Sequence, residues 1–169
     1  MIKRISGTPN MIQVPRKASM GTVPAGSAVT FDAATGYVKA LAITDPSVFG
    51  VIQESIISTD GNYTTAGVPV YVDQGDLDTV WEVDVSNGGA ATPFAATDVG
   101  QFFKMGTTPN MIDANTRSST AGAGFTAQGL VFLCVGFISA TTVVSAAGTA
   151  SGKGLFKIMS MSQARPSTT

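Results

Sequence analysis

The chain alternates short apolar segments with turns of small residues, and no segment keeps the spacing of an amphipathic helix. The clearest segment is Val80–Val85, in which Trp81 and every second residue after it are apolar while the residues between them are acidic. Such alternation is typical of a strand with one buried face, and the Asn87-Gly88 dipeptide after it is typical of a tight turn. At most one turn of helix is predicted, at 95–98. The sequence therefore predicts an all-β fold: a compact sandwich-like, barrel-like or β-tulip-like domain.

Other segments show the same character with weaker alternation. The Asp32–Gly36 turn predicts a hairpin between the segments on either side of it. The segment around Cys134 is apolar throughout but far shorter than the roughly 20 residues of a membrane helix, so a buried strand is predicted. Cys134 itself is expected to be a small core residue. The further strands are predicted at 28–31, 37–41, 49–57, 68–72, 101–105, 130–138, 141–144 and 155–159.

The 169 residues fit one domain flanked by two extensions. Residues 1–20 contain Pro9 and Pro15, no acidic residue and no clear period, so they are predicted to form an extended N-terminal arm. Residues 21–159 are expected to form the β domain, and 160–169 a short polar C-terminal tail. The first residues lack the apolar core of a secretory signal, and the lone cysteine excludes an intrachain disulfide. Both features favour synthesis and folding in a cytosol.

Charge is scarce and unevenly placed along the chain. Charged residues make up 12% of the sequence, against roughly 25% in a typical soluble domain, which favours burial of surface in an assembly. The charged residues within 1–39 are all basic except Asp32, and those within 40–103 are all acidic. From Lys104 onward they are basic again, with Asp113 as the one acidic residue. One interpretation is that part of the molecule faces an acidic partner, or that the basic terminal segments of one subunit pair with the acidic middle segment of another. The other is that the segments mix in space and cancel.

The residues that carry most catalysis are missing from this sequence. There is no histidine, the usual acid–base group and metal ligand. Asp73, Asp76 and Asp78 form an acidic cluster, but without the spacing of a calcium loop they indicate a solvated turn. Gly148–Gly154 is one residue too short for a phosphate-binding loop and lacks its hydroxyl residue. We therefore expect no catalytic, cofactor-binding or metal-binding residues and no enzyme activity.

A five-residue segment occurs twice. Thr8–Ile12 and Thr108–Ile112 have the same sequence, Thr-Pro-Asn-Met-Ile, while their wider flanks differ. The repeat indicates either one extended segment used in two equivalent contacts or convergence on a Pro-Asn turn.

In style and order, residues 20 to 160 resemble the small head-decoration, or cement, proteins of tailed bacteriophages. The resemblance rests on the N-terminal segment and on a series of short phrases: Pro24–Asp32, Phe49–Gln53, Gly67–Val72, Asp98–Gln101, Ile112-Asp113 and Gly154–Ile158. It implies a structural virion protein on the outer capsid surface, made in the cytoplasm of a host bacterium. It also implies a homo-oligomer, commonly a trimer at local three-fold positions, that binds the major capsid protein and stabilises contacts between its subunits. No cofactor, membrane partner or nucleic-acid partner is expected.

The resemblance also suggests how such an arm would work. Lys3, Arg4, Arg16 and Lys17 are expected to dock the arm on an acidic shell surface, and removal of residues 1–20 should then abolish binding without unfolding the domain.

The alternative function is a phage tail, fibre or surface adhesion module that binds a host glycan, which requires an exposed aromatic patch. Most aromatic residues fall in strand-like segments, which favours core packing: Phe31, Phe49, Tyr71, Trp81, Phe102, Phe103 and Phe125.

Overall fold

The computed structural model describes residues 1–87, 93–106, 110–119, 131–140 and 150–159. Within these ranges every regular element is a strand except one 3-10 turn, η1 (Ala96–Asp98), so the predicted all-β class is confirmed. The strands are β1 (Ile2–Ser6), β2 (Met11–Pro15), β3 (Ala28–Phe31), β4 (Val38–Ala40), β5 (Gly50–Ile52), β6 (Pro69–Asp73), β7 (Val80–Ser86), β8 (Phe102–Met105), β9 (Met111–Ser118), β10 (Phe132–Ala140) and β11 (Ala150–Ile158).

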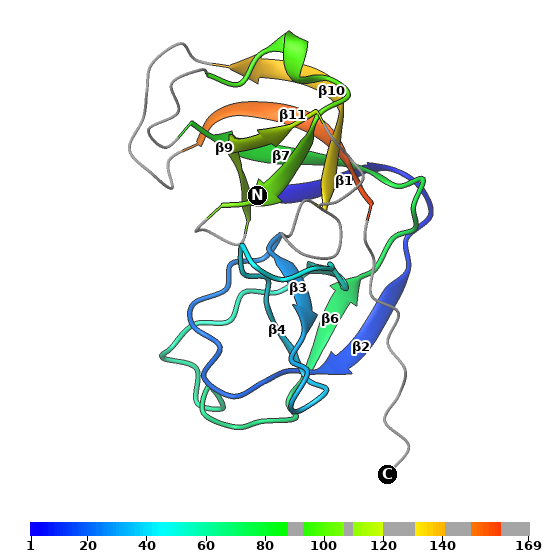
Figure 1. The fold of residues 1–169 in the computed structure, drawn as a ribbon. Helices are drawn as coiled ribbons and strands as arrows, with labels where there is room; N and C mark the ends of the chain where they lie inside the picture. The colour runs from blue at the N-terminus through cyan, green and yellow to red at the C-terminus, as the bar shows by residue number, and fades with distance from the viewer. Residues whose placement is uncertain (88–92, 107–109, 120–130, 141–149, 160–169) are drawn as a thin grey trace.

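Five strands close into a barrel, which we call the upper barrel from its place in Figure 1. Its order is β7-β11-β10-β8-β9, and the parallel pairing of β9 with the second half of β7 closes it. The first half of β7 pairs on the same edge with β1, which adds a sixth, antiparallel strand. One edge of β7 is thus shared between two partners, while its other edge pairs with β11 along most of its length.

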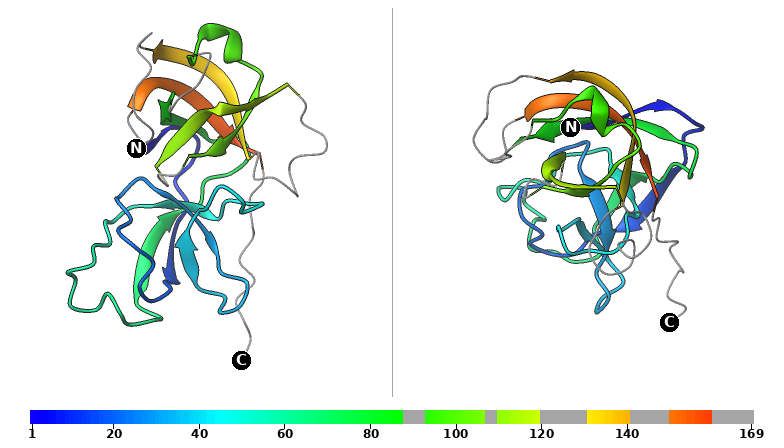
Figure 2. Two further views of the ribbon diagram at one scale, coloured as in Figure 1. Left: turned by 60° about the vertical axis from the view of Figure 1, so that its left-hand side comes forward. Right: turned by 45° about the horizontal axis from the view of Figure 1, so that its top comes forward.

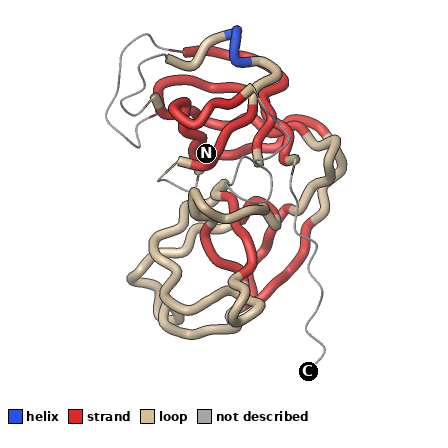
Figure 3. The backbone as a smooth tube through the Cα atoms, viewed as in Figure 1, coloured by secondary structure: helices blue, strands red, loops and turns tan. Residues whose placement is uncertain are grey.

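The second sheet, called the lower sheet, has the order β2-β6-β5-β3-β4. Its hairpin β3–β4 pairs Phe31 with Val38 across the predicted turn, so that prediction is confirmed. An isolated parallel bridge between Arg16, just beyond β2, and Val38 of β4 joins the two outer strands. Long loops connect the lower strands, whereas the upper barrel consists mostly of strand (Figure 3).

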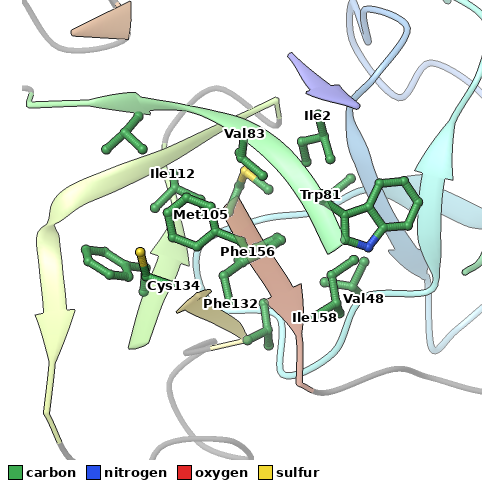
Figure 4. Close-up of a cluster of buried hydrophobic side chains, with 14 of the residues drawn as sticks. Ile2, Val48, Trp81, Val83, Met105, Ile112, Phe132, Cys134, Phe156 and Ile158 are labelled. Atoms are coloured by element: carbon green, nitrogen blue, oxygen red, sulfur yellow. The ribbon is translucent and has the colours of Figure 1, made fainter. Parts of the chain in front are cut away.

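The larger hydrophobic cluster fills the upper barrel and extends across the junction with the lower sheet. Trp81 and Val83 of β7 pack there with Phe156 of β11, all at most 1% exposed (Figure 4). Val48 and Val51, from the part of the chain that builds the lower sheet, belong to the same cluster. A second cluster lies inside the lower sheet: Val14, Val23, Val29, Val38, Phe49, Ile52, Ile56, Val70 and Val72. The larger cluster therefore includes residues of both sheets and lies at their junction.

Gly26 connects β1 to the lower sheet. Its amide donates to the Ile52 carbonyl, and its own carbonyl accepts from the Ile2 amide, each at 2.8 Å. Its φ of +77° is a conformation that favours glycine, and a Cβ there would lie 2.9 Å from the Ile2 carbonyl oxygen. A larger residue at this position would push β1 away from the sheet.

The predicted extended arm at residues 1–20 is corrected by the structure. Those residues contain β1, a strand of the upper barrel, and β2, a strand of the lower sheet, and Figures 1 and 2 show them passing from one to the other. The physical reason is that Ile2 and Val14 are buried, at 3% and 8% exposed, by pairing with β7 and β6 far along the chain. The predicted tail at 160–169 lies outside the described residues.

The other strand predictions agree with the structure to different degrees. The predictions at 28–31, 68–72, 80–85 and 101–105 match β3, β6, β7 and β8 to within one residue at each end. The segment predicted at 49–57 shortens to Gly50–Ile52, β11 begins earlier than predicted, and β9 was not predicted. The predicted helical turn is η1, whereas the segment predicted at 141–144 lies outside the described residues.

Candidate interaction surface

The four basic residues expected to dock the chain have different environments in the structure. Arg4 lies beside Asp73, whose carboxylate it contacts at 3.1 Å, and Lys17 forms an ion pair with Asp32. Arg16 is buried, at 2% exposed. Lys3 is exposed, and no ion pair engages it within the described ranges. The structure therefore does not bring these residues together as one basic surface.

Arg16 is almost fully buried and engaged within the chain, so the structure does not present it as a docking residue. Its guanidinium donates hydrogen bonds to the carbonyl oxygens of Lys17, Asn62 and Tyr63, and to the Asn62 side chain, at 2.6–3.2 Å. The planar group provides several donors in fixed directions, so one side chain satisfies several carbonyls of the loop between β5 and β6. Arg16 thus holds that loop against the end of β2.

The uneven charge along the sequence is largely cancelled between neighbouring strands. Glu82 and Asp84 of β7 lie beside β11, where Lys153 contacts both carboxylates at 2.9 and 3.7 Å. The hydrogen bond to Glu82 is the main reason that the pKa of Lys153 is raised. Further ion pairs join other parts of the chain: Lys39 with Asp45, Arg117 with Asp98, and Lys157 with Asp78. The interpretation in which basic and acidic segments mix in space is the one that these pairs support.

The acidic cluster of the sequence is dispersed in the same way. Asp73 is paired with Arg4, Asp78 with Lys157, and Asp76 accepts from the Thr79 hydroxyl at 2.7 Å, which lowers the pKa of Asp76. Over the residues that the structure describes, no group of three or more His, Cys, Asp or Glu side chains could hold a metal ion.

Cys134 is a core residue, as the sequence predicts. It is 1% exposed, and burial raises the pKa of its thiol to about 11. A thiol with so high a pKa is protonated at neutral pH and is a poor nucleophile.

Five outward side chains of β2 and β6 are exposed and uncharged. Charged groups lie beside them: Asp73, opposite Met11, is buried against Arg4, and the Glu54 carboxylate accepts a hydrogen bond from the Tyr71 amide at 2.8 Å. Gln13 lies opposite Tyr71, and Pro15 lies opposite Pro69, while Met11 occupies the far end of β2. Tyr71 and Met11 are 53% and 50% exposed, and the alternate residues Val14, Val70 and Val72 face the core. We call these five outward residues the β2–β6 face. Tyrosine and methionine are enriched in protein interfaces, so this face is a candidate contact surface.

A cavity of ≈ 300 Å³ lies where the two sheets meet. Its lining includes Ile2, Lys3 and Arg4 of β1, Gln53, Asp73 and Trp81. The Arg4–Asp73 pair crosses this junction from β1 to β6, and Asp73 is 1% exposed. This is the arrangement of a structural ion pair, because the Arg4 guanidinium and the Asp73 carboxylate neutralise each other.

The repeated segment has two different settings. Met11 and Ile12 begin β2, which pairs antiparallel with β6, while Met111 and Ile112 begin β9, which pairs parallel with β7. Ile112 is fully buried, whereas its counterpart Ile12 is only partly buried. The two copies therefore do not make equivalent contacts within the described chain. Residues 107–109 lie outside the described ranges.

Most aromatic residues considered for a sugar platform are in the core. Phe49, Trp81 and Phe103 are at most 1% exposed, and Phe31 packs on Phe49 with a ring-centroid distance of 4.4 Å. Tyr71 is the exposed member on the β2–β6 face, and Phe125 lies outside the described residues.

The comparisons with known proteins identify no relative. No family model matches the chain, and no curated protein and no solved structure shows significant similarity to it. In the described ranges, no helix has the length and apolar character needed to cross a membrane.

Proposed function

We propose that this protein is a structural virion protein that binds the outer surface of a phage capsid and stabilises contacts between major capsid protein subunits. The proposal rests on the resemblance of the sequence to decoration proteins and on the character of the surface. It assigns the chain a binding role without catalysis and places it on the virion.

The observation that carries the proposal is the combination of internally paired charge with exposed apolar residues on rigid strands. Most charged side chains of β7 and its neighbours are used in intramolecular ion pairs. Tyr71 and Met11, in contrast, stand exposed on the paired strands β2 and β6. Binding through a surface of this kind costs little free energy of desolvation and requires no reordering of the backbone. Both properties suit a protein that binds in many copies to one capsid shell.

The β2–β6 face is the part of the described surface that we assign to the shell contact. Tyr71 presents a large, stiff side chain, and the paired prolines beside it remove backbone donors that would otherwise need partners. Lys3 lies outside this face and is proposed to add a charge contact with an acidic shell surface.

The first test is the copy number of the chain in purified particles. Quantitative peptide mass spectrometry should find this chain at a ratio near one to one with the major capsid protein. A ratio of a few per cent would overturn the proposal in favour of a tail or fibre part, and absence would remove the virion role.

The second test is rebinding to particles stripped of the chain. Tyr71→Asp should weaken binding by about tenfold or more, because it places an unpaired charge at the centre of the contact. Ile57→Asp is the matched control, since Ile57 is 44% exposed in a loop of the same sheet. Equal binding by the two variants would exclude the β2–β6 face as the contact.

A further inference from the structure

The cavity at the junction of the two sheets has the volume of a small-ligand site. Pockets for small molecules in proteins measure about 300–1,000 Å³, and this one measures ≈ 300 Å³. Trp81 and Asp73, each 1% exposed, belong to its lining together with the exposed residues Lys3 and Gln53. The lining therefore extends from the surface of the molecule to groups that are buried in it.

Arg4 provides hydrogen-bond donors that the described chain does not use. It lies opposite Trp81 in the β1–β7 ladder, so the two side chains share one face of that pair of strands. Asp73 holds the Arg4 guanidinium through contacts at 3.1 Å to Nη2 and 3.4 Å to Nη1. In the described part of the chain these are the only contacts of the guanidinium with a hydrogen-bond acceptor, and an arginine has more N–H donors than they use. The remaining donors, Nε–H among them, are left for a ligand.

The charged side chains around the cavity favour an anionic ligand. Its lining contains two cationic side chains, Lys3 and Arg4, against the carboxylate of Asp73. That carboxylate is already engaged, because it also accepts a hydrogen bond from the Asn10 amide at 3.3 Å, whereas Lys3 has no ion pair in the described ranges. A planar guanidinium binds a carboxylate through two parallel hydrogen bonds, which are stronger than those between neutral groups. A carboxylate is therefore the group that suits the free edge of Arg4.

Trp81 gives a second, independent indication of a ligand. Its indole lies at the edge of the larger hydrophobic cluster (Figure 4), and its Nε1–H is buried without a hydrogen-bond partner among the described residues. Buried polar groups in native proteins almost always have a partner, so an unpaired one indicates an acceptor that comes from outside the chain. Trp81 also lines the cavity, which places this donor in its wall.

We propose that the junction cavity binds a small organic carboxylate of the size of a glutamate side chain. The carboxylate pairs with the free edge of Arg4, which Asp73 holds in place, and accepts a hydrogen bond from Trp81 Nε1–H. Lys3 adds positive charge at the rim. A neutral amide of the same shape lacks the charge that strengthens these hydrogen bonds, so it binds more weakly. This site goes beyond the proposed capsid role and is separate from the β2–β6 face.

The test is a titration of the purified full chain at constant ionic strength. The probe is N-acetylglutamate α-amide, and N-acetylglutamine α-amide is the matched neutral ligand. Trp81 is the single tryptophan, so one indole N–H signal in a proton–nitrogen NMR spectrum reports on the cavity. The glutamate probe should shift this signal in a saturable way and bind about tenfold or more tightly than the glutamine probe.

Variants of the basic residues locate the bound probe. Arg4→Lys keeps the charge without the planar edge and should weaken binding of the glutamate probe by about tenfold or more. Lys3→Gln removes charge at the rim and should weaken it by about threefold. Lys104→Gln is the matched control, because Lys104 lies in β8 and does not line the cavity, and it should bind the probe as the wild type does.

The proposal is overturned by any of three results: no saturable shift of the indole signal, equal affinity for the two probes, or wild-type affinity in Arg4→Lys. If Arg4→Lys does not fold, equal binding by Lys3→Gln and Lys104→Gln has the same meaning. None of these measurements involves a capsid, so their failure is distinct from failure of the particle-counting test of function.

Discussion

Arg16 shows how a charged side chain becomes part of a core. Arginine is mostly exposed in proteins, so its sequence position among basic neighbours indicated a surface role. Its burial depends on Asn62 and Tyr63, which lie 46 and 47 residues further along the chain and provide the acceptors. No local pattern contains that information, because the contact forms only when the lower sheet is assembled.

Replacement of Arg16 should therefore destabilise the fold rather than weaken binding alone. Arg16→Ala leaves several buried carbonyl groups without donors, and we expect a loss of about 3 kcal/mol in the free energy of unfolding. The measurement is urea unfolding followed by circular dichroism. Lys17→Ala, which removes a partly exposed ion pair, should cost under about 1 kcal/mol. Equal stability of the two variants would contradict the structural role of Arg16.

Asp32 gives a prediction of pH dependence. The hydrogen bond from the Lys17 ammonium group lowers the pKa of Asp32 from 3.8 to about 2. Because the folded pKa is the lower one, the carboxylate contributes stability above pH 3.8, and that contribution is lost as the pH falls towards 2. The melting temperatures of wild type and Asp32→Asn should thus differ at pH 5 and converge near pH 2. A constant difference over this range would show that the ion pair has no effect on stability.

Cys134 should react only when the protein unfolds. The thiol is buried and its pKa is raised to about 11, so little thiolate exists at pH 8. We expect an aromatic disulfide reagent to label the native protein slowly, at a rate that rises with urea in step with unfolding, and to label the denatured chain at once. Rapid labelling of the native protein would place Cys134 in an open site.

At the scale of elements, β7 is the strand that both sequence and structure make central. Its alternation predicted a strand because Trp81, Val83 and Val85 face the core, whereas the acidic residues between them lie on the other, partly exposed face. β1 and β9 were missed because their buried residues are few and lie among polar ones, as in Met111–Ser118. Their pairing with β7 comes from long-range contacts, which outweigh weak local propensity.

The status of β1 as a true strand can be tested with a pair of variants in that strand. Ile2 is 3% exposed and belongs to the larger core, whereas Ile5 is 50% exposed. Ile2→Ala should lower the free energy of unfolding by about 2–4 kcal/mol because it leaves a cavity beside Trp81. Ile5→Ala should change it by less than about 0.5 kcal/mol. Thermal melts of both variants give the comparison, and equal melting temperatures would restore the idea of a detachable arm.

At the scale of the whole molecule, we expect the two sheets to unfold together. Residues of both belong to the larger hydrophobic cluster, and Arg4 of β1 reaches the buried Asp73 of β6. Trp81, the single tryptophan, lies in that core at 1% exposed and lines the cavity at the junction. Its fluorescence therefore reports the state of the junction itself.

A double-mutant cycle measures this coupling. Arg4→Met alone leaves the buried Asp73 carboxylate without its charged partner and should cost about 3 kcal/mol or more. Combined with Asp73→Asn, which removes that charge, the loss in the free energy of unfolding should be clearly smaller.

Wild-type unfolding followed by Trp81 fluorescence and by circular dichroism should give coincident transitions. Two separate transitions would show that the sheets unfold independently.

The candidate surface was less predictable than the fold. The all-β class and the strands of strongest alternation followed from local pattern, whereas the β2–β6 face follows from a pairing between residues 11–15 and 69–73. Tyr71 was assigned to the core from its aliphatic neighbours, yet it takes the outward position of its strand. Which face of a strand is buried depends on its partners, and the sequence of one strand does not contain them.

The placement of β1 has a consequence for the order in which the chain can fold during synthesis. Ile2 pairs with Val83, so β1 has no strand to pair with until about 80 further residues have been made, a delay of roughly 4–16 seconds at typical translation rates. All strands of the lower sheet, from β2 to β6, are complete before then. We therefore expect the lower sheet to form first during synthesis, and β1 to be fixed in place only when β7 emerges beside it.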